Sequence, residues 1–217
     1  MINSVNNLIL IQDTLKNKIK NLKPPTVIAV SKTFPIENIY PLINHGHEHY
    51  GENKVQEAIE KWPSIKDDFA NIKLHMIGKL QTNKVKHAVR VFDYIHSLDS
   101  TKLAEKISRE QIKINKNIKI FIQINIGNED QKVGIDIERL ESFYDKCTKD
   151  FGLNIIGLMC LPPKQNNSFN YFLKMRELLN NINLQELSMG MSSDYLKAAE
   201  CNSTFLRIGS KIFGERV

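Results

Sequence analysis

The chain has 217 residues, of which 41% are hydrophobic and 25% are charged, a composition typical of a globular protein that needs no disulfide or metal staple. Its three cysteines form no CxxC pair, which argues against a structural zinc site. The formal net charge of +6 attracts anions of any kind and selects no function by itself. The sequence shows neither a signal-peptide pattern nor an apolar run that could cross a bilayer, so a cytoplasmic protein with reduced thiols is expected.

The predicted elements begin with an amphipathic helix over residues 6–21, which places Leu8, Ile11, Leu15 and Ile19 on one face. The next elements in chain order are a strand at 26–31, a helix at 35–45, a strand at 47–51, a helix at 54–61, a strand at 72–78, a helix at 82–90 and a strand at 92–98. They are followed by a helix capped by Ser100 or Thr101, a strand at 118–126, a helix at 137–148, a strand at 154–159, a helix at 169–181, a strand at 184–190, a helix at 193–200 and a strand at 204–210.

This alternation predicts an α/β protein with a parallel sheet. Eight strands fit a closed barrel better than an open sheet, so the expected fold is one (β/α)8 TIM-like barrel that spans residues 1–217 as a single domain. The tail after the last strand is too short for a full helix. We expect the extra N-terminal helix to cover that place.

Working residues of such barrels lie at the C-terminal ends of the strands. Lys32 follows the continuously apolar strand VIAV, where desolvation would favour a neutral amine. A neutral amine can attack an aldehyde and form an imine. Lys32 taken alone is also compatible with a side chain that extends from the strand end into water.

The ends of the last two strands predict a phosphate site. Gly190 and Gly209 allow close approach of the backbone, and the amides near Ser192 and Ser210 could hold a phosphate. Each glycine alone is better explained by an ordinary turn, so the prediction depends on both strand ends meeting at one barrel mouth. Arg207 would bring a buried cation to the same place, where it faces either a ligand or a buried carboxylate such as Glu52 or Asp194.

Other sequence motifs give weaker indications of function. His45, His47 and His49 alternate, so two of them could share a strand face and bind a metal, but no carboxylate or cysteine at ligand spacing supports this, and the pattern favours strand or loop histidines. No glycine-rich nucleotide motif and no GxSxG elbow occurs. The basic charge leaves a nucleic-acid-binding module as a weak alternative, which no stacking aromatics or known binding motif supports.

The chain resembles the pyridoxal phosphate homeostasis protein family, which is similar to the barrel domain of alanine racemase without its second domain. The resemblance runs from about Thr26 to Arg216 and depends on several motifs in the same order. These are AVSKTFP (29–35), YGENKVQE (50–57), HMIGKLQTNK (75–84), INIGNEDQKVGI (124–135), GLMCLPP (157–163), SMGMSSDYLKAA (188–199) and STFLRIGSKIFGER (203–216).

The resemblance implies that Lys32 carries pyridoxal 5′-phosphate (PLP) as a Schiff base. It further implies that Ser192 and the amides of Gly209 and Ser210 hold the phosphate, and that Arg207 faces the pyridine nitrogen. The remaining residues that it places around the cofactor are Asn53, Ile77, Gly78 and Met191.

A cation beside the ring nitrogen disfavours protonation of that nitrogen and weakens the ring as an electron sink. We therefore expect a monomeric carrier that takes part in intracellular vitamin B6 homeostasis without efficient turnover, exchanging PLP with PLP-dependent apoenzymes. A PLP-dependent amino-acid racemase or lyase that uses Lys32 as a base is the alternative.

Overall fold

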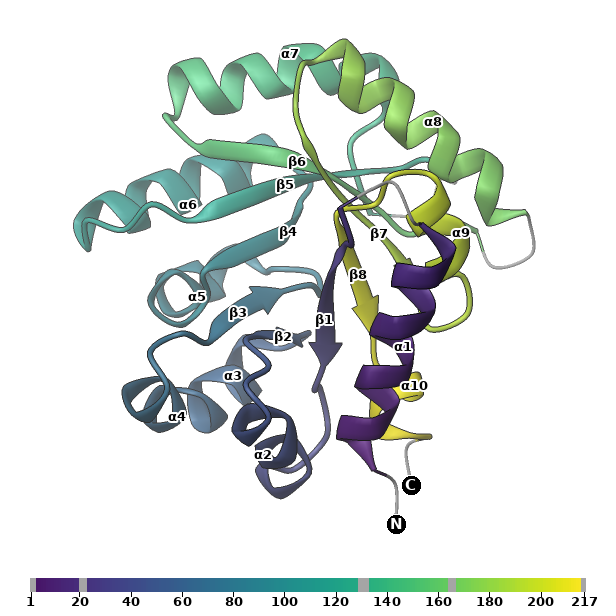
Figure 1. Ribbon diagram of the computed structural model, residues 1–217. Helices are drawn as coiled ribbons and strands as arrows, with labels where there is room; N and C mark the ends of the chain where they lie inside the picture. Colours follow the sequence, from purple (N-terminus) through teal and green to yellow (C-terminus); the bar gives the residue numbers. More distant parts are fainter. Residues whose placement is uncertain (1–2, 20–22, 129–132, 164–166, 216–217) are drawn as a thin grey trace.

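The computed structural model describes residues 3–19, 23–128, 133–163 and 167–215. Within these residues eight parallel strands close into a barrel in sequence order, with helices on the outside (Figure 1). The barrel closes where the first strand pairs with the last, with Thr26 opposite Phe205 and Ala29 opposite Ile208. The (β/α)8 barrel expected from the sequence is confirmed.

The strands lie close to their predicted positions. They are β1 (Thr26–Val30), β2 (His49–Glu52), β3 (Lys73–Met76), β4 (Tyr94–Leu98), β5 (Lys119–Ile124), β6 (Asn154–Cys160), β7 (Glu186–Met191) and β8 (Phe205–Ile208). The α-helices are α1 (Ser4–Lys18), α2 (Ile36–Asn44), α3 (Val55–Lys61), α4 (Pro63–Asp68), α5 (Val85–Val91), α6 (Thr101–Lys113), α7 (Leu140–Asp145), α8 (Ser168–Asn181), α9 (Tyr195–Glu200) and α10 (Ser210–Phe213). A 3₁₀ turn precedes α5 and another precedes α7, and a π-helical turn at Lys146–Asp150 follows α7.

Three predictions about the secondary structure were wrong. The sequence analysis missed α4, in which Pro63 takes the first helical position that proline favours. The helix predicted at 137–148 is a 3₁₀ turn, an α-helix and a π turn in succession. Ser210, placed at the end of the last strand, instead begins α10. Residues 20 and 21 of the first predicted helix lie outside the described residues.

The N-terminal helix α1 lies on the outside of the barrel against α2, α9 and α10, in the place that the short C-terminal helix leaves, as expected (Figure 1). The Asn3 side chain caps α1 by accepting from the Asn6 amide. On the apolar face of α1, Leu8, Ile11 and Leu15 are buried. The Asn7 side chain donates to the Ile212 carbonyl of α10 at 3.0 Å. In the part of the chain that the structure describes, no helix is both long and apolar enough to cross a membrane.

Apolar side chains form two separate layers. The larger one fills the space between the strands and the helices. The smaller one lies inside the barrel and contains Ile28, Tyr94, Phe121, Met159 and Phe205. Two histidines complete this interior, because His75 stacks on Tyr94 at 4.2 Å between ring centroids and His96 stacks on Phe121 at 4.3 Å.

Both interior histidines are fully buried, at 0% exposure. Burial lowers the pKa of His75 and of His96 well below the usual value, and the nearby Arg207 charge lowers that of His96 further. A histidine in the unfolded chain takes up its proton near a pH of about 6.5. Below that pH the unfolded state binds more protons than the folded state, so folding is destabilised as the pH falls.

We therefore predict an acid-sensitive fold. Between pH 7.5 and 5.5, His75 and His96 together lower the free energy of unfolding by about 3 kcal/mol. The pKa values of His47 and His49 are lowered as well and add to this loss, so chemical denaturation at the two pH values measures the total. The His96→Gln variant carries no titrating ring there, so its pH-dependent loss is smaller by about 1.4 kcal/mol. His87→Ala, at an exposed position, keeps the full dependence. Equal losses in the wild type and His96→Gln would contradict the account.

Candidate functional site

A cavity of about 600 Å³ opens at the C-terminal ends of the strands, within the size range of small-ligand sites. The structure brings eight of the nine residues predicted for the site into its wall. These eight are Lys32, Asn53, Ile77, Met191, Ser192, Arg207, Gly209 and Ser210. The ninth, Gly78, lines an adjoining cavity of about 340 Å³ that shares Asn53, Ile77 and Leu161 with the first.

The turn that presents Lys32 is held on both sides. Before it, the Ser31 amide donates to the Gly51 carbonyl at 3.0 Å and the Ser31 hydroxyl donates to Glu52 Oε1 at 2.8 Å. After it, Thr33 adopts a positive φ of 67°, and its amide donates to Glu57 Oε1 at 2.6 Å. The backbone of Lys32 is therefore fixed by β2 and α3, while its side chain lines the cavity.

Glu52 is the central acceptor of the clamp, by which we mean the hydrogen bonds that hold Ser31 and Thr33 on either side of Lys32. It is fully buried, and its Oε1 also accepts from Lys61 Nζ at 3.0 Å and from Trp62 Nε1 at 3.1 Å. Burial raises the pKa of the Glu52 carboxyl, and the Lys61 charge opposes that rise. This carboxylate is committed to Lys61, so it is not the partner of Arg207 that the sequence left open.

Arg207 projects from β8 into the barrel mouth and is only 4% exposed. Its guanidinium donates to Ser188 Oγ at 2.5 Å and to the Cys160 carbonyl at 2.8 Å, and both acceptors are neutral. Asp194, the other carboxylate considered from the sequence, accepts from the Met191 amide at 2.7 Å. No ion pair joins Arg207 to a carboxylate among the described residues. Burial lowers the pKa of Arg207 to about 10, which leaves it a cation at neutral pH.

Backbone amides converge on the Ser192 hydroxyl at the β7 and β8 ends of the cavity. The amides of Gly209 and Lys211 point at Ser192 Oγ, at 3.3 and 3.4 Å. Gly190 supports the turn before Ser192, because its φ of +88° and a Cβ only 2.5 Å from Ala198 Cβ would both exclude a larger residue. The arrangement gathers N–H donors at one point, which is suited to an anion.

Gly78 acts on the site through the backbone beside it. A Cβ at this position would lie 2.4 Å from the Asn53 carbonyl oxygen and 2.8 Å from the Asn53 Cα. The glycine therefore lets β3 approach the segment that follows β2 and places Asn53 in the wall of both cavities. The role implied for Gly78 from the sequence, lining the pocket, is met only in the adjoining cavity.

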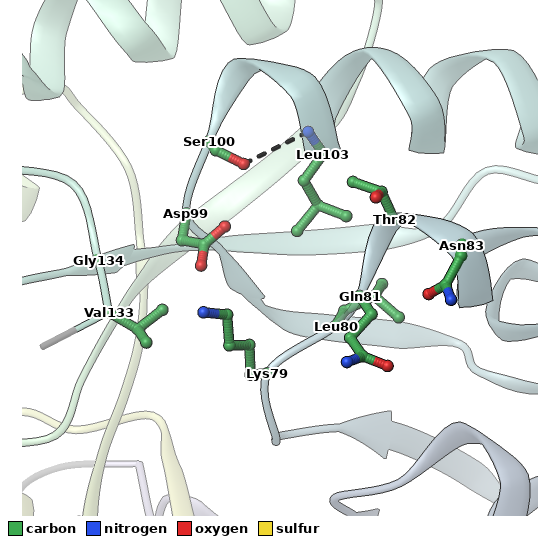
Figure 2. A pocket seen from close by; sticks show the side chains of 10 residues that line it. All are labelled: Lys79, Leu80, Gln81, Thr82, Asn83, Asp99, Ser100, Leu103, Val133 and Gly134. Carbon is green, nitrogen blue, oxygen red and sulfur yellow. Dashed lines mark hydrogen bonds between the residues drawn. The ribbon is translucent and has the colours of Figure 1, made fainter.

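A more open cleft of about 690 Å³ continues from the adjoining cavity and shares Lys79 and Val133 with it. Figure 2 shows the Lys79 ammonium and the Asp99 carboxylate pointing toward each other across this cleft. Burial raises the pKa of Asp99, and the Ser100 hydrogen bond and the Lys79 charge oppose the rise. The cleft offers a second lysine near the mouth, which makes Lys79 a natural control for the chemistry of Lys32.

The alternating histidines are loop and strand residues, which is the interpretation that the sequence favoured: His45 and His47 follow α2, and His49 begins β2. His47 donates to the His49 carbonyl at 2.9 Å, and the described residues contain no group of three or more side chains that could hold a metal. The sequence analysis missed His75 and His96, which lie inside the barrel. Their signal was a lone histidine in the middle of each of two apolar strands, a position where a solvated residue is not expected.

Comparison with known proteins places these features in a family. A family model described as "Alanine racemase, N-terminal domain" matches residues 11–217. A protein from Aquifex aeolicus named "Pyridoxal phosphate homeostasis protein" is 39% identical over 199 residues, which cover 88% of this chain and 86% of that protein.

Solved structures give the same result. PipY of Synechococcus elongatus without PLP is 33% identical, with a TM-score of 0.86 over 96% of this chain and 99% of that chain. The same protein with PLP bound is 34% identical, with a TM-score of 0.81 over 94% and 100%. An alanine racemase from Acinetobacter baumannii, at 16% identity, shares the fold, with a TM-score of 0.71 over 99% of this chain and 63% of that chain.

The close approach at Gly78 yields a stability prediction. Gly78→Ala forces the Asn53 backbone to move, and we expect it to lower the free energy of unfolding by about 1–3 kcal/mol, as overpacking does. The matched control is Gly209→Ala, whose Cβ would meet Val30 Cβ at an ordinary 3.4 Å. Urea denaturation of the two variants measures the difference. Similar free energies of unfolding for both variants would show that the backbone after β3 can shift enough to accept a Cβ at Gly78.

Proposed function

This chain belongs to the pyridoxal phosphate homeostasis protein family, and we propose that it binds PLP covalently on Lys32 and holds it for delivery. The observation that carries the proposal is the convergence of a lysine amine, a buried guanidinium and a group of backbone amides on one cavity. The PipY structure with PLP bound supports the same ligand for a chain that shares 34% of its residues.

The phosphate of PLP fits the point where the amides of Gly209 and Lys211 converge. Two N–H donors and the Ser192 hydroxyl there offer hydrogen bonds to a doubly charged anion. We assign Ser192, Gly209 and Ser210 to this part of the ligand, with Met191 and Ile77 as apolar walls.

The ring nitrogen of PLP fits beside Arg207. The guanidinium is buried and, among the described residues, is paired with neutral oxygens alone, so a lone pair on an unprotonated nitrogen is a favourable neighbour for it. The fixed positive charge also disfavours protonation of that nitrogen. We assign Asn53 to the remaining wall of the ring pocket.

Lys32 supplies the covalent link. In its neutral form the Lys32 amine would attack the aldehyde carbon, the aldehyde oxygen would leave as water, and a C=N bond would join the ligand to Lys32. Water reverses the same reaction, and another amine can take the place of Lys32. The clamp around Ser31 and Thr33 fixes the backbone from which the amine acts, so the position of the linkage does not depend on the loop alone.

We further propose that the protein holds and releases PLP without efficient turnover of amino acids. With Arg207 beside it, PLP is a weak electron sink, which removes the main contribution of this cofactor to carbanion chemistry. Among the described residues that line the cavity, the side chains that can accept a proton are Lys32 and Glu215. The proposal extends to a cytoplasmic monomer that delivers PLP to PLP-dependent apoenzymes.

The covalent assignment predicts a defined adduct. The protein loaded with PLP should show a visible absorption band that borohydride abolishes, and peptide mass mapping should then find the cofactor on Lys32. The Lys32→Ala variant should bear no adduct, whereas Lys79→Ala, which removes the lysine of the neighbouring cleft, should be labelled like the wild type. A trapped adduct on Lys32→Ala would refute the assignment.

The carrier assignment predicts slow chemistry. L-alanine and other amino acids incubated with the loaded protein should keep their configuration over many hours, as measured by chiral chromatography. An alanine racemase assayed in parallel confirms that the conditions allow inversion. Fast inversion at near-stoichiometric PLP would establish instead the racemase that the sequence left as the alternative.

A further inference from the structure

A chain of hydrogen bonds crosses the inside of the barrel and ends on Arg207. Arg207 donates to Ser188 Oγ at 2.5 Å, and Ser188 Oγ lies 2.8 Å from His96 Nδ1. His96 Nε2 lies 2.9 Å from His75 Nδ1, and His75 Nε2 lies 2.9 Å from His49 Nδ1. Five strands (β8, β7, β4, β3 and β2) therefore contribute one side chain each.

The chain connects the two ends of the barrel. Ser188, His96 and His75 are fully buried, and Arg207 is nearly so. His49 is the first residue of β2 and is half-buried, at the end opposite the cavity. None of the three histidines lines the cavity, so the proposed binding chemistry leaves them without a role.

The direction of every hydrogen bond follows from Arg207. A guanidinium has donors and no acceptor, so the Ser188 oxygen accepts from it. The buried Ser188 hydroxyl hydrogen also needs an acceptor, and among the described residues its other hydrogen-bond partner is His96 Nδ1, so the hydroxyl donates to His96. An imidazole that accepts on Nδ1 carries its proton on Nε2, so His96 donates to His75, and by the same reasoning His75 donates to His49.

The surroundings of the rings favour these neutral forms. His75 and His96 lie between Tyr94, Phe121 and Phe205, which offer no charge to stabilise an imidazolium. Burial also lowers the pKa of His49. The charged groups that face His49 are of both signs, Glu48 and Asp93 against Lys73 and Lys119.

We propose that His96, His75 and His49 are positioning residues for Arg207. As three neutral imidazoles protonated on Nε2, they form a one-way hydrogen-bond chain that fixes the Ser188 hydroxyl and, through it, the guanidinium at the ring of the bound cofactor. His96 is the decisive member because it takes the Ser188 hydrogen away from Arg207. Without that acceptor the hydroxyl can rotate, and among the described residues the guanidinium is then anchored by its hydrogen bond to the Cys160 carbonyl at 2.8 Å.

Two variants of His96 separate positioning from packing. His96→Phe keeps an aromatic ring to stack on Phe121 but removes both nitrogens, whereas His96→Gln loses the ring but offers a carbonyl acceptor and an NH2 donor group. If His96 acts by packing, the His96→Phe variant should bind PLP more tightly than His96→Gln. If His96 positions Arg207, the His96→Gln variant should bind PLP more tightly than His96→Phe. Ser97→Ala, at a buried position on the same strand whose hydroxyl takes no part in the chain, is the control.

The inference rests on the proposed function, and its first measurement is the dissociation constant of PLP. We expect His96→Phe to weaken PLP binding about tenfold, the loss of roughly one hydrogen bond to a charged group, and His96→Gln to stay within about threefold of the wild type. Ser97→Ala should bind like the wild type. Binding by His96→Phe equal to or tighter than that by His96→Gln, with both folded by circular dichroism, would overturn the positioning role.

The second measurement uses the protein without PLP. In ¹⁵N-histidine NMR spectra near neutral pH, His49, His75 and His96 should each show a protonated Nε2 and an unprotonated Nδ1. A protonated Nδ1 on His75 or His96 would refute the proposed direction of the hydrogen bonds even if PLP binds to Lys32. Conversely, failure of the wild type to bind PLP would refute the proposed function while this spectrum still reports on the chain.

Discussion

The pairing of β1 with β8 is the contact on which the whole site depends. It joins two strands that are far apart in the sequence and closes the barrel, with Ile28 opposite Arg207. Closure of a parallel barrel brings all C-terminal strand ends to one rim. Lys32, Ser192 and Arg207 come from three different strand ends and line one cavity for that reason.

A buried positive charge organises the inside of this barrel. Arg207 has neutral acceptors instead of a carboxylate, and the histidines behind Ser188 are kept neutral by burial. A carboxylate in place of Ser188 would neutralise the guanidinium and remove its influence on a ligand. The arrangement therefore keeps a cation available at the cavity, and the proposed carrier role depends on this cation.

The sequence predicted the parts of this structure that depend on local pattern. Continuous apolar runs identified the strands, and the residue after each run identified Lys32 and Ser192. Long-range contacts were not predictable in this way. Two examples are the hydrogen bond of Glu52 with Lys61 instead of Arg207 and the hydrogen bond between His75 and His96. Both depend on which strands are neighbours and on the register of their pairing. Likewise, α4 was missed because Trp62 and Pro63 read locally as the end of a helix and not the beginning of a second one.

The central claim is that one cavity holds PLP, with Lys32, Arg207 and the Ser192 turn each contacting a different part of it. A crystal structure of the protein loaded with PLP and reduced with borohydride tests it most directly. The account predicts continuous density from Lys32 Nζ to the pyridine ring, the ring nitrogen beside Arg207 and the phosphate at Ser192 and Gly209. Density attached to Lys79 in the neighbouring cleft, or a ring turned away from Arg207, would contradict it.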